Sequence, residues 1–122
     1  KDYLIKEFPQ KVFKGKIHAV EHHTAHLFSA FNVSPFNKAA VISVDGFGDF
    51  ASTAWGIGDG VDISLDDRVY FPHSLGIFYM AITQFIGFNN WGDEYKVMGL
   101  APYGRPTYLE QMRQIIKLMP DF

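Results

Sequence analysis

Two histidines spaced four residues apart are the first feature of this sequence that points to chemistry. His22 and His26 lie in the string Glu-His-His-Thr-Ala-His. On a helix, residues at this spacing share one face, with their β-carbons about 5–6 Å apart. Two imidazoles so placed can bind one transition-metal ion through their neutral nitrogens. A helix start whose histidines contact only solvent or carbonyl groups has the same pattern, so a metal site requires a third ligand from another segment.

A candidate third ligand follows a predicted buried strand. The β-branched run at residues 39–44 indicates that strand, and Asp45 comes directly after it. The carboxyl end of a strand is where α/β sheets place ligands and catalytic groups. The next residues form a glycine-rich turn whose N–H groups can approach phosphate oxygens: Gly46, Phe47, Gly48 and Asp49. Asp45 would then face both a cation and a phosphate, although an ordinary Asp-Gly hairpin explains the same pattern.

A third polar segment, residues 92–104, holds two acids, one lysine and three glycines between two predicted helices. Lys96 can neutralise a phosphate, Glu94 can orient a ribose or another polar substrate, and Gly104 allows close backbone approach. A solvated connector with a Lys–Glu pair is the alternative interpretation. Outside this segment, His73 precedes a predicted helix, and we favour a cap-region role over contact with substrate.

The elements that must position these residues follow from hydrophobic periodicity and turn signals. A short strand at residues 16–20 is expected to lead into a helix that starts at the histidines. Three strands joined by turns and then three helical stretches should follow, at residues 39–44, 51–57, 61–65, 74–86, 96–100 and 107–118. The predicted fold class is α/β of the ribonuclease-H type, with a mixed sheet and flanking helices.

Composition excludes several functional classes. The 122 residues include 48% hydrophobic residues, which suffices for a packed core, and no cysteine, which excludes disulfides and thiolate chemistry. A net charge of -2 gives no electrostatic basis for binding nucleic acid or an anionic membrane. No apolar run spans a bilayer and no signal-peptide pattern opens the chain, so we expect a cytoplasmic protein without nucleic-acid or membrane partners.

Taken together, the three segments resemble the nodulation-protein and antibiotic O-carbamoyltransferase family. The resemblance runs from about Lys16 to Gly104 and is carried by the order and spacing of four strings. They are His22-His23-Thr24-Ala25-His26 with Ser29-Ala30-Phe31, Val44-Asp45-Gly46-Phe47-Gly48-Asp49, His73-Ser74-Leu75-Gly76, and Gly92-Asp93-Glu94-Tyr95-Lys96-Val97-Met98-Gly99-Leu100-Ala101-Pro102-Tyr103-Gly104.

This resemblance implies a fold and a reaction. The family's larger domain has the actin/Hsp70-like fold, and residues 1–122 would be a fragment of that domain. A separate YrdC-like domain of the parent chain makes carbamoyl-adenylate from carbamoyl phosphate and ATP. The larger domain then passes the carbamoyl group to a hydroxyl of a small molecule, such as a sugar, a nodulation factor or an antibiotic.

The resemblance also implies roles for individual residues. His22, His26 and Asp45 match the metal ligands, and the metal is iron(II) or another divalent cation. The residues that match contacts to ATP or the carbamoyl-adenylate are Asp45, Gly46, Gly48, Asp49, Glu94, Lys96 and Gly104. The acceptor hydroxyl also needs a base, for which His23 and His73 are the candidates.

Two other functions fit the same sequence. One is a relative that transfers threonylcarbamoyl to tRNA, against which the acidic charge balance argues. The other is a non-catalytic, actin-like nucleotide-binding domain that has kept the fold.

The chain begins at Lys1 without an initiator methionine and ends directly after a helical pattern, so we expect a piece of a longer protein. The resembling family has a lobe before the histidines and draws further nucleotide and metal contacts from far downstream. We therefore predict that residues 1–122 alone bind metal weakly and catalyse no transfer. A carbamoyl-transfer assay on the purified chain checks this, and product formation would contradict it.

Overall fold

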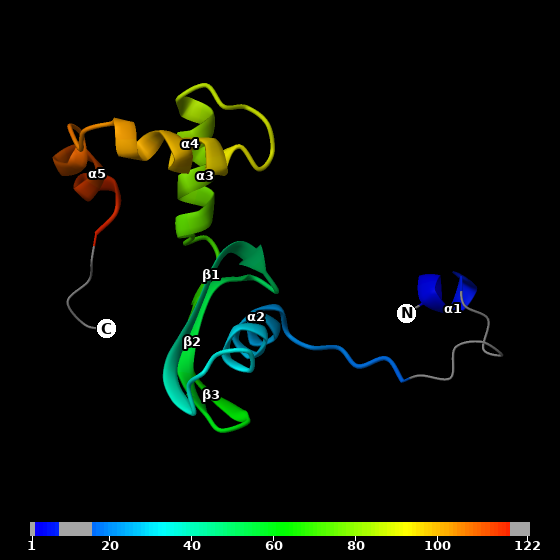
Figure 1. Ribbon diagram of the computed structural model, residues 1–122. Helices are drawn as coiled ribbons and strands as arrows, with labels where there is room; N and C mark the ends of the chain where they lie inside the picture. The colour runs from blue at the N-terminus through cyan, green and yellow to red at the C-terminus, as the bar shows by residue number, and fades with distance from the viewer. Residues whose placement is uncertain (1, 8–15, 118–122) are drawn as a thin grey trace. The chain divides into compact units, whose positions relative to one another are not determined.

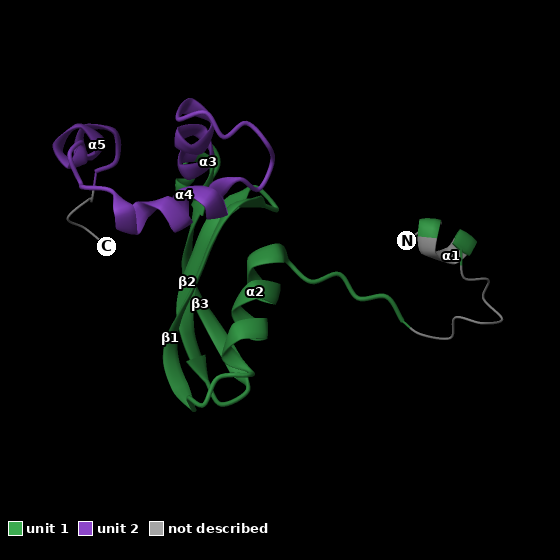
Figure 2. Ribbon diagram, turned by 45° about the horizontal axis from the view of Figure 1, so that its top comes forward, with its two compact units in different colours: residues 1–77 green, residues 78–122 purple. Residues whose placement is uncertain are grey.

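The computed structural model describes residues 2–7 and 16–117. The chain divides into two compact units, residues 1–77 and 78–122, which are coloured separately in Figure 2. The first unit begins with a short helix, α1 (Asp2–Glu7), and contains the candidate metal ligands.

The first unit is built on a three-stranded antiparallel sheet with one helix packed against it. Its strands are β1 (Lys38–Gly48), β2 (Ala51–Asp59) and β3 (Asp62–Tyr70), in the order β1-β2-β3. Helix α2 (His22–Phe31) contacts β1 and β2 (Figure 1). The predicted α/β class and the three consecutive strands are therefore confirmed.

Two details of the predicted sheet are wrong. Residues 16–21 form no regular secondary structure, and Ile17 and Val20 are exposed, so their apolar pattern does not correspond to a strand. The described sheet is antiparallel throughout rather than mixed. The physical reason is connectivity, because strands joined by turns of two residues can only run in opposite directions.

The core of this unit lies between α2 and β2. Leu27 and Phe31 of the helix are buried, as are Ala51 and Ala54 of the strand. Gly58 allows the close approach, because a β-carbon there would collide with the Phe31 ring. Small residues on β2 thus let the apolar face of α2 lie directly on the sheet.

The β1–β2 ladder is interrupted where the polar residues gather. Val44 pairs with Thr53 and Gly48 pairs with Ala51, so three residues of β1 face a single residue of β2. Such a bulge redirects the side chains of the longer strand. The turn that follows has positive φ angles at both Asp49 and Phe50, as two-residue hairpin turns require. Asp45 is the first residue of the irregular stretch.

The second unit is helical. Helix α3 (Leu75–Phe85) starts in the first unit and continues into the second, followed by α4 (Glu94–Leu100), η1 (Ala101–Tyr103) and α5 (Leu109–Ile115). Gly87, with a φ of 102°, closes α3 through a bond from its N–H to the Gln84 carbonyl, just after the predicted end of this helix at residue 86.

The other helix predictions were correct in type, although α5 begins at Leu109, two residues after its predicted start at residue 107. Leu118, its predicted end, lies outside the described residues. Within the described ranges, no helix combines the length and apolar character needed to cross a membrane.

Leu27 offers a direct test of this packing. The side chain is 1% exposed, so the Leu27→Ala variant should lower the free energy of unfolding by about 2–5 kcal/mol. Val33, just beyond the same helix, is 84% exposed, and Val33→Ala should change stability by less than about 0.5 kcal/mol. Urea unfolding of this chain, followed by far-ultraviolet circular dichroism, measures both. Equal losses for the two variants would contradict the assigned core.

Candidate metal centre

The first turn of α2 is fixed by the residue before it. The Glu21 carboxylate accepts hydrogen bonds from the N–H groups of His23 (3.0 Å) and Thr24 (2.7 Å) and from the Thr24 hydroxyl (2.6 Å). The Arg68 guanidinium lies 3.5 Å from the same carboxylate. Burial alone would raise the pKa of Glu21, but these hydrogen bonds and the Arg68 charge outweigh it and lower the pKa to about 2. Glu21 is therefore an ionised N-terminal cap.

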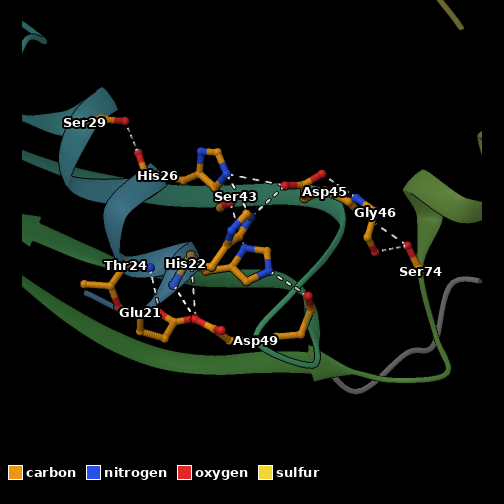
Figure 3. Close-up of polar contacts among 12 residues, drawn as sticks. Glu21, His22, Thr24, His26, Ser29, Ser43, Asp45, Gly46, Asp49 and Ser74 are labelled. Atoms are coloured by element: carbon orange, nitrogen blue, oxygen red, sulfur yellow. Dashed lines mark hydrogen bonds and ion pairs between the residues drawn. The ribbon is translucent and has the colours of Figure 1, made fainter. Parts of the chain in front are cut away.

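The structure brings His22, His26 and Asp45 together. Asp45 Oδ2 lies 2.8 Å from His22 Nε2 and 3.4 Å from His26 Nε2, and the two imidazole nitrogens are 3.1 Å apart. One potential ligand atom from each residue falls within 4.8 Å of the others. The imidazoles point from α2 toward the Asp45 carboxylate, at the start of the bulged stretch of β1 (Figure 3). The predicted geometry is present, while the predicted metal role stays a prediction.

Asp45 is held in its charged form. The hydrogen bond with His22 and the 2.6 Å bond from the Gly46 N–H are the main causes that lower the pKa of this carboxyl, and they outweigh its partial burial. The nearby imidazoles add a smaller electrostatic contribution when protonated. At neutral pH the centre thus presents one negative charge between two imidazoles, which is a donor set suited to a divalent transition metal.

The start of α3 holds the segment that carries Asp45. The Ser74 hydroxyl donates to the Gly46 carbonyl (2.7 Å) and also accepts the Ile77 N–H (3.1 Å), as a helix cap does. A β-carbon on Gly76 would collide with the Asp45 carbonyl, so only glycine permits this approach. Residue spacing alone assigned no role to Ser74 or Gly76, although a serine immediately before the first helical residue is a recognisable cap signal.

The turn predicted to contact phosphate also supports the histidines. Gly48 lies under His22, whose ring would overlap a β-carbon at that position. Asp49 Oδ2 accepts the His22 backbone N–H at 2.9 Å and so satisfies one free donor at the start of α2. Gly46 and Gly48 have no side chain that could block the approach of a ligand to their own backbone. Phosphate contact at Gly46, Gly48 and Asp49 stays a prediction.

The His23 ring is enclosed between α2 and the sheet. Its side chain is 0% exposed, with Nδ1 2.9 Å from the Ser43 hydroxyl and Nε2 2.9 Å from the Ala51 carbonyl. Both ring nitrogens are occupied and shielded from solvent, so this position argues against the predicted role as base. Because His23 follows His22 by one position, it points about 100° round the helix from the metal pair, and its two partners come from β1 and β2.

His73 is exposed, and its side chain makes no hydrogen bond within the part of the chain that the structure describes. The expected cap role is wrong for this residue, because the neighbouring Ser74 provides the cap of α3. A role for His73 as a base stays a prediction.

Three of the residues predicted to contact ATP or the adenylate, Glu94, Lys96 and Gly104, lie in the second unit. The Lys96 ammonium is 2.7 Å from Asp93, a nearly buried carboxylate that also accepts hydrogen bonds from Asn90. The connector interpretation anticipated a Lys–Glu pair, and the structure instead pairs Lys96 with Asp93. Glu94 begins α4, and Gly104 follows η1, where its N–H donates to Ala101. Adenylate contact at Glu94, Lys96 and Gly104 stays a prediction.

Comparison with known sequences identifies the class of protein. The family model described as the carbamoyltransferase N-terminus matches residues 4–120, nearly the whole chain. The chain therefore belongs to the carbamoyltransferase family, as the resemblance predicted.

Two similar proteins are nodulation proteins. The chain is 41% identical over 106 residues to NolNO of Sinorhizobium fredii, with 85% of this chain and 15% of the relative covered. It is 43% identical over 103 residues to NolO of Bradyrhizobium diazoefficiens, with 82% and 18% covered. An uncharacterised Synechocystis protein is 43% identical over 109 residues, with 89% and 17% covered. The chain thus spans less than a fifth of each of these relatives.

The cap of α2 gives a prediction about pH. Because the pKa of Glu21 is lower in the folded state than its ordinary value of 4.5, the ionised cap stabilises the fold above that value and loses this contribution as the pH falls toward 2. Glu21→Gln should cost about 1 kcal/mol near neutral pH. The difference from the parent chain should shrink below about pH 4.

Urea midpoints at several pH values measure this difference. The matched control is Glu110→Gln, which removes an exposed carboxylate paired with Arg113 and should leave the acid dependence nearly unchanged. A Glu21→Gln penalty that persists undiminished in acid would show that the carboxylate charge does not stabilise the helix.

Proposed function

We propose that this chain supplies the His-x-x-x-His metal site of an O-carbamoyltransferase. In the complete protein, the carbamoyl group would pass from carbamoyl-adenylate, made from carbamoyl phosphate and ATP, to a hydroxyl of a sugar, a nodulation factor or an antibiotic. The convergence of His22, His26 and Asp45 carries the proposal, because segments separated by about twenty residues meet with three potential metal-ligand atoms. Membership of the carbamoyltransferase family supports the class of reaction.

The residues fit a divalent cation such as iron(II). Two imidazole nitrogens and one carboxylate oxygen are typical ligands, and Asp45 is held ionised as metal binding requires. His26 and Asp45 also line an open cavity of about 440 Å³, which gives a ligand access to the site. A cation held there would polarise the carbamoyl carbonyl or stabilise the departing phosphate, since nitrogen donation makes a carbamoyl carbon a poor electrophile.

The proposed reaction needs parts beyond this chain. The bond between the carbamoyl carbon and the adenylate oxygen breaks, a bond to the acceptor oxygen forms, AMP leaves, and a base takes the hydroxyl proton. A YrdC-like domain of the parent chain would make the adenylate, and an actin/Hsp70-like fold would be completed by residues outside this sequence. Within the chain, the phosphate is assigned to residues 46–49 and the adenylate to Glu94, Lys96 and Gly104.

A ligand substitution tests the proposal in the full-length protein. His26→Ala removes one imidazole from an exposed position, so the fold should survive while bound metal and carbamoyl transfer are lost. Activity should fall on the order of a hundredfold or more, because metal stabilisation of a transition state contributes several kcal/mol. Metal content by elemental analysis and product by mass spectrometry are the two measurements.

His18→Ala is the matched control, because His18 is also exposed but lies before α2 and outside the cluster. It should retain both metal and activity. Transfer at the normal rate by the His26→Ala variant would rule out the assigned metal site, and a nucleotide-binding protein without transfer activity would point to the non-catalytic alternative.

A further inference from the structure

A fully buried histidine sits beside the candidate metal ligands without belonging to them. His23 lies between the two residues of the cluster contributed by α2, and its ring centroid is 5.1 Å from that of His22. Burial of an imidazole costs free energy unless both nitrogens are hydrogen-bonded, and here both are. A residue needed only to fill this space would be apolar, so the polar ring calls for a specific explanation.

The partners of His23 determine its tautomer. The Ala51 carbonyl can only accept a hydrogen bond, so Nε2 carries the proton and donates. Nδ1 lies 2.9 Å from the Ser43 hydroxyl, which can rotate to donate to this nitrogen when Nε2 carries the ring's single proton. The His23 ring can therefore make both hydrogen bonds at once in only one orientation.

The two partners lie on opposite sides of the irregular stretch that carries Asp45. Ser43 is on β1, two residues before Asp45, while Ala51 opens β2 and pairs with Gly48. One rigid ring thus connects the first turn of α2 to both strands that flank the bulge. Because His22 and His26 are on the same short helix, any shift of α2 relative to β1 changes their distances to Asp45.

We propose that His23 and Ser43 are positioning residues that set the separation between the imidazoles of His22 and His26 and the Asp45 carboxylate. The inference rests on the proposed metal site and adds residues that contact neither metal nor substrate. Supporting residues around a metal site commonly change its affinity by 10–100-fold, because ligands misplaced by about 1 Å bind poorly. His23 acts through the helix backbone, so an effect on the order of tenfold is expected.

The experiment measures Co(II) affinity of the folded full-length protein by calorimetric titration and by Co(II) absorption. His23→Leu keeps the volume but leaves Ser43 and Ala51 without their partner, and should weaken Co(II) binding on the order of tenfold. His23→Gln retains an amide N–H that can reach the Ala51 carbonyl, and should recover part of the affinity. Ser43→Ala, which removes one hydroxyl, should give a smaller loss in the same direction.

Thr83→Val is the matched control for loss of a buried polar group. Thr83 is 1% exposed and bonds to Tyr79 of its own helix in the second unit, so its replacement should leave Co(II) affinity unchanged whatever it does to stability. If His23 and Ser43 served stability alone, their substitution would likewise leave Co(II) affinity unchanged. Unchanged affinity in a folded His23→Leu variant, alongside tight Co(II) binding by the unsubstituted protein, would overturn the positioning role and leave the proposed function standing.

If His23→Leu does not fold, Ser43→Ala decides: weakened binding supports the role, and unchanged binding overturns it. Failure of the unsubstituted protein to bind Co(II) in a His26-dependent manner would instead overturn the proposed function, and this inference with it.

Discussion

The first turn of α2 meets the irregular end of β1 through contacts that consecutive residues make in different directions. The His22 ring lies over Gly48, and the His22 backbone N–H donates to the Asp49 carboxylate. The ring of the next residue, His23, points into the core toward Ser43 and Ala51. A helix of ten residues is marginally stable in isolation, so these tertiary contacts determine where it starts and how it lies. The candidate metal centre depends on this junction, because both imidazoles come from one side of it and the carboxylate comes from the other.

The junction combines apolar packing with directed polar contacts. Leu27 and Phe31, in the C-terminal half of α2, are buried against small residues of β2. Such apolar packing holds the helix on the sheet but does not fix its exact position along the strands. Hydrogen bonds constrain distance and angle much more narrowly than apolar contacts do. The Glu21 cap, the Asp49 contact and the His23 bridge all lie at the end of α2 nearest Asp45. The most directional contacts between α2 and the sheet therefore lie beside the three candidate metal ligands.

Local sequence patterns predicted most of the elements, although not the absence of a strand at residues 16–20, and the three metal-ligand candidates, because both depend on short-range periodicity. The helical spacing of His22 and His26 and the position of Asp45 after a β-branched run were sufficient for that. The supporting residues depend on non-local approach, which no spacing rule encodes. Only the fold reveals that Gly76 lies against the Asp45 carbonyl, or that Lys96 pairs with Asp93 instead of Glu94. His23 is the clearest case, since its side of the helix was predictable but its two partners were not.

The charge balance of the centre is compatible with the phosphate contact proposed for residues 46–49. Two neutral imidazoles and one carboxylate would leave a bound divalent cation with net positive charge, which favours a further anionic ligand. Of the two glycines that follow Asp45, Gly48 is covered by the His22 ring, while Gly46 leaves backbone near the site without a side chain. Gly48 thus lets the His22 ring approach β1, and Gly46 would leave room for the phosphate proposed to bind beside the cation. The bulged, glycine-containing part of β1 therefore allows the packing of α2 and would also allow the chemistry proposed for the site.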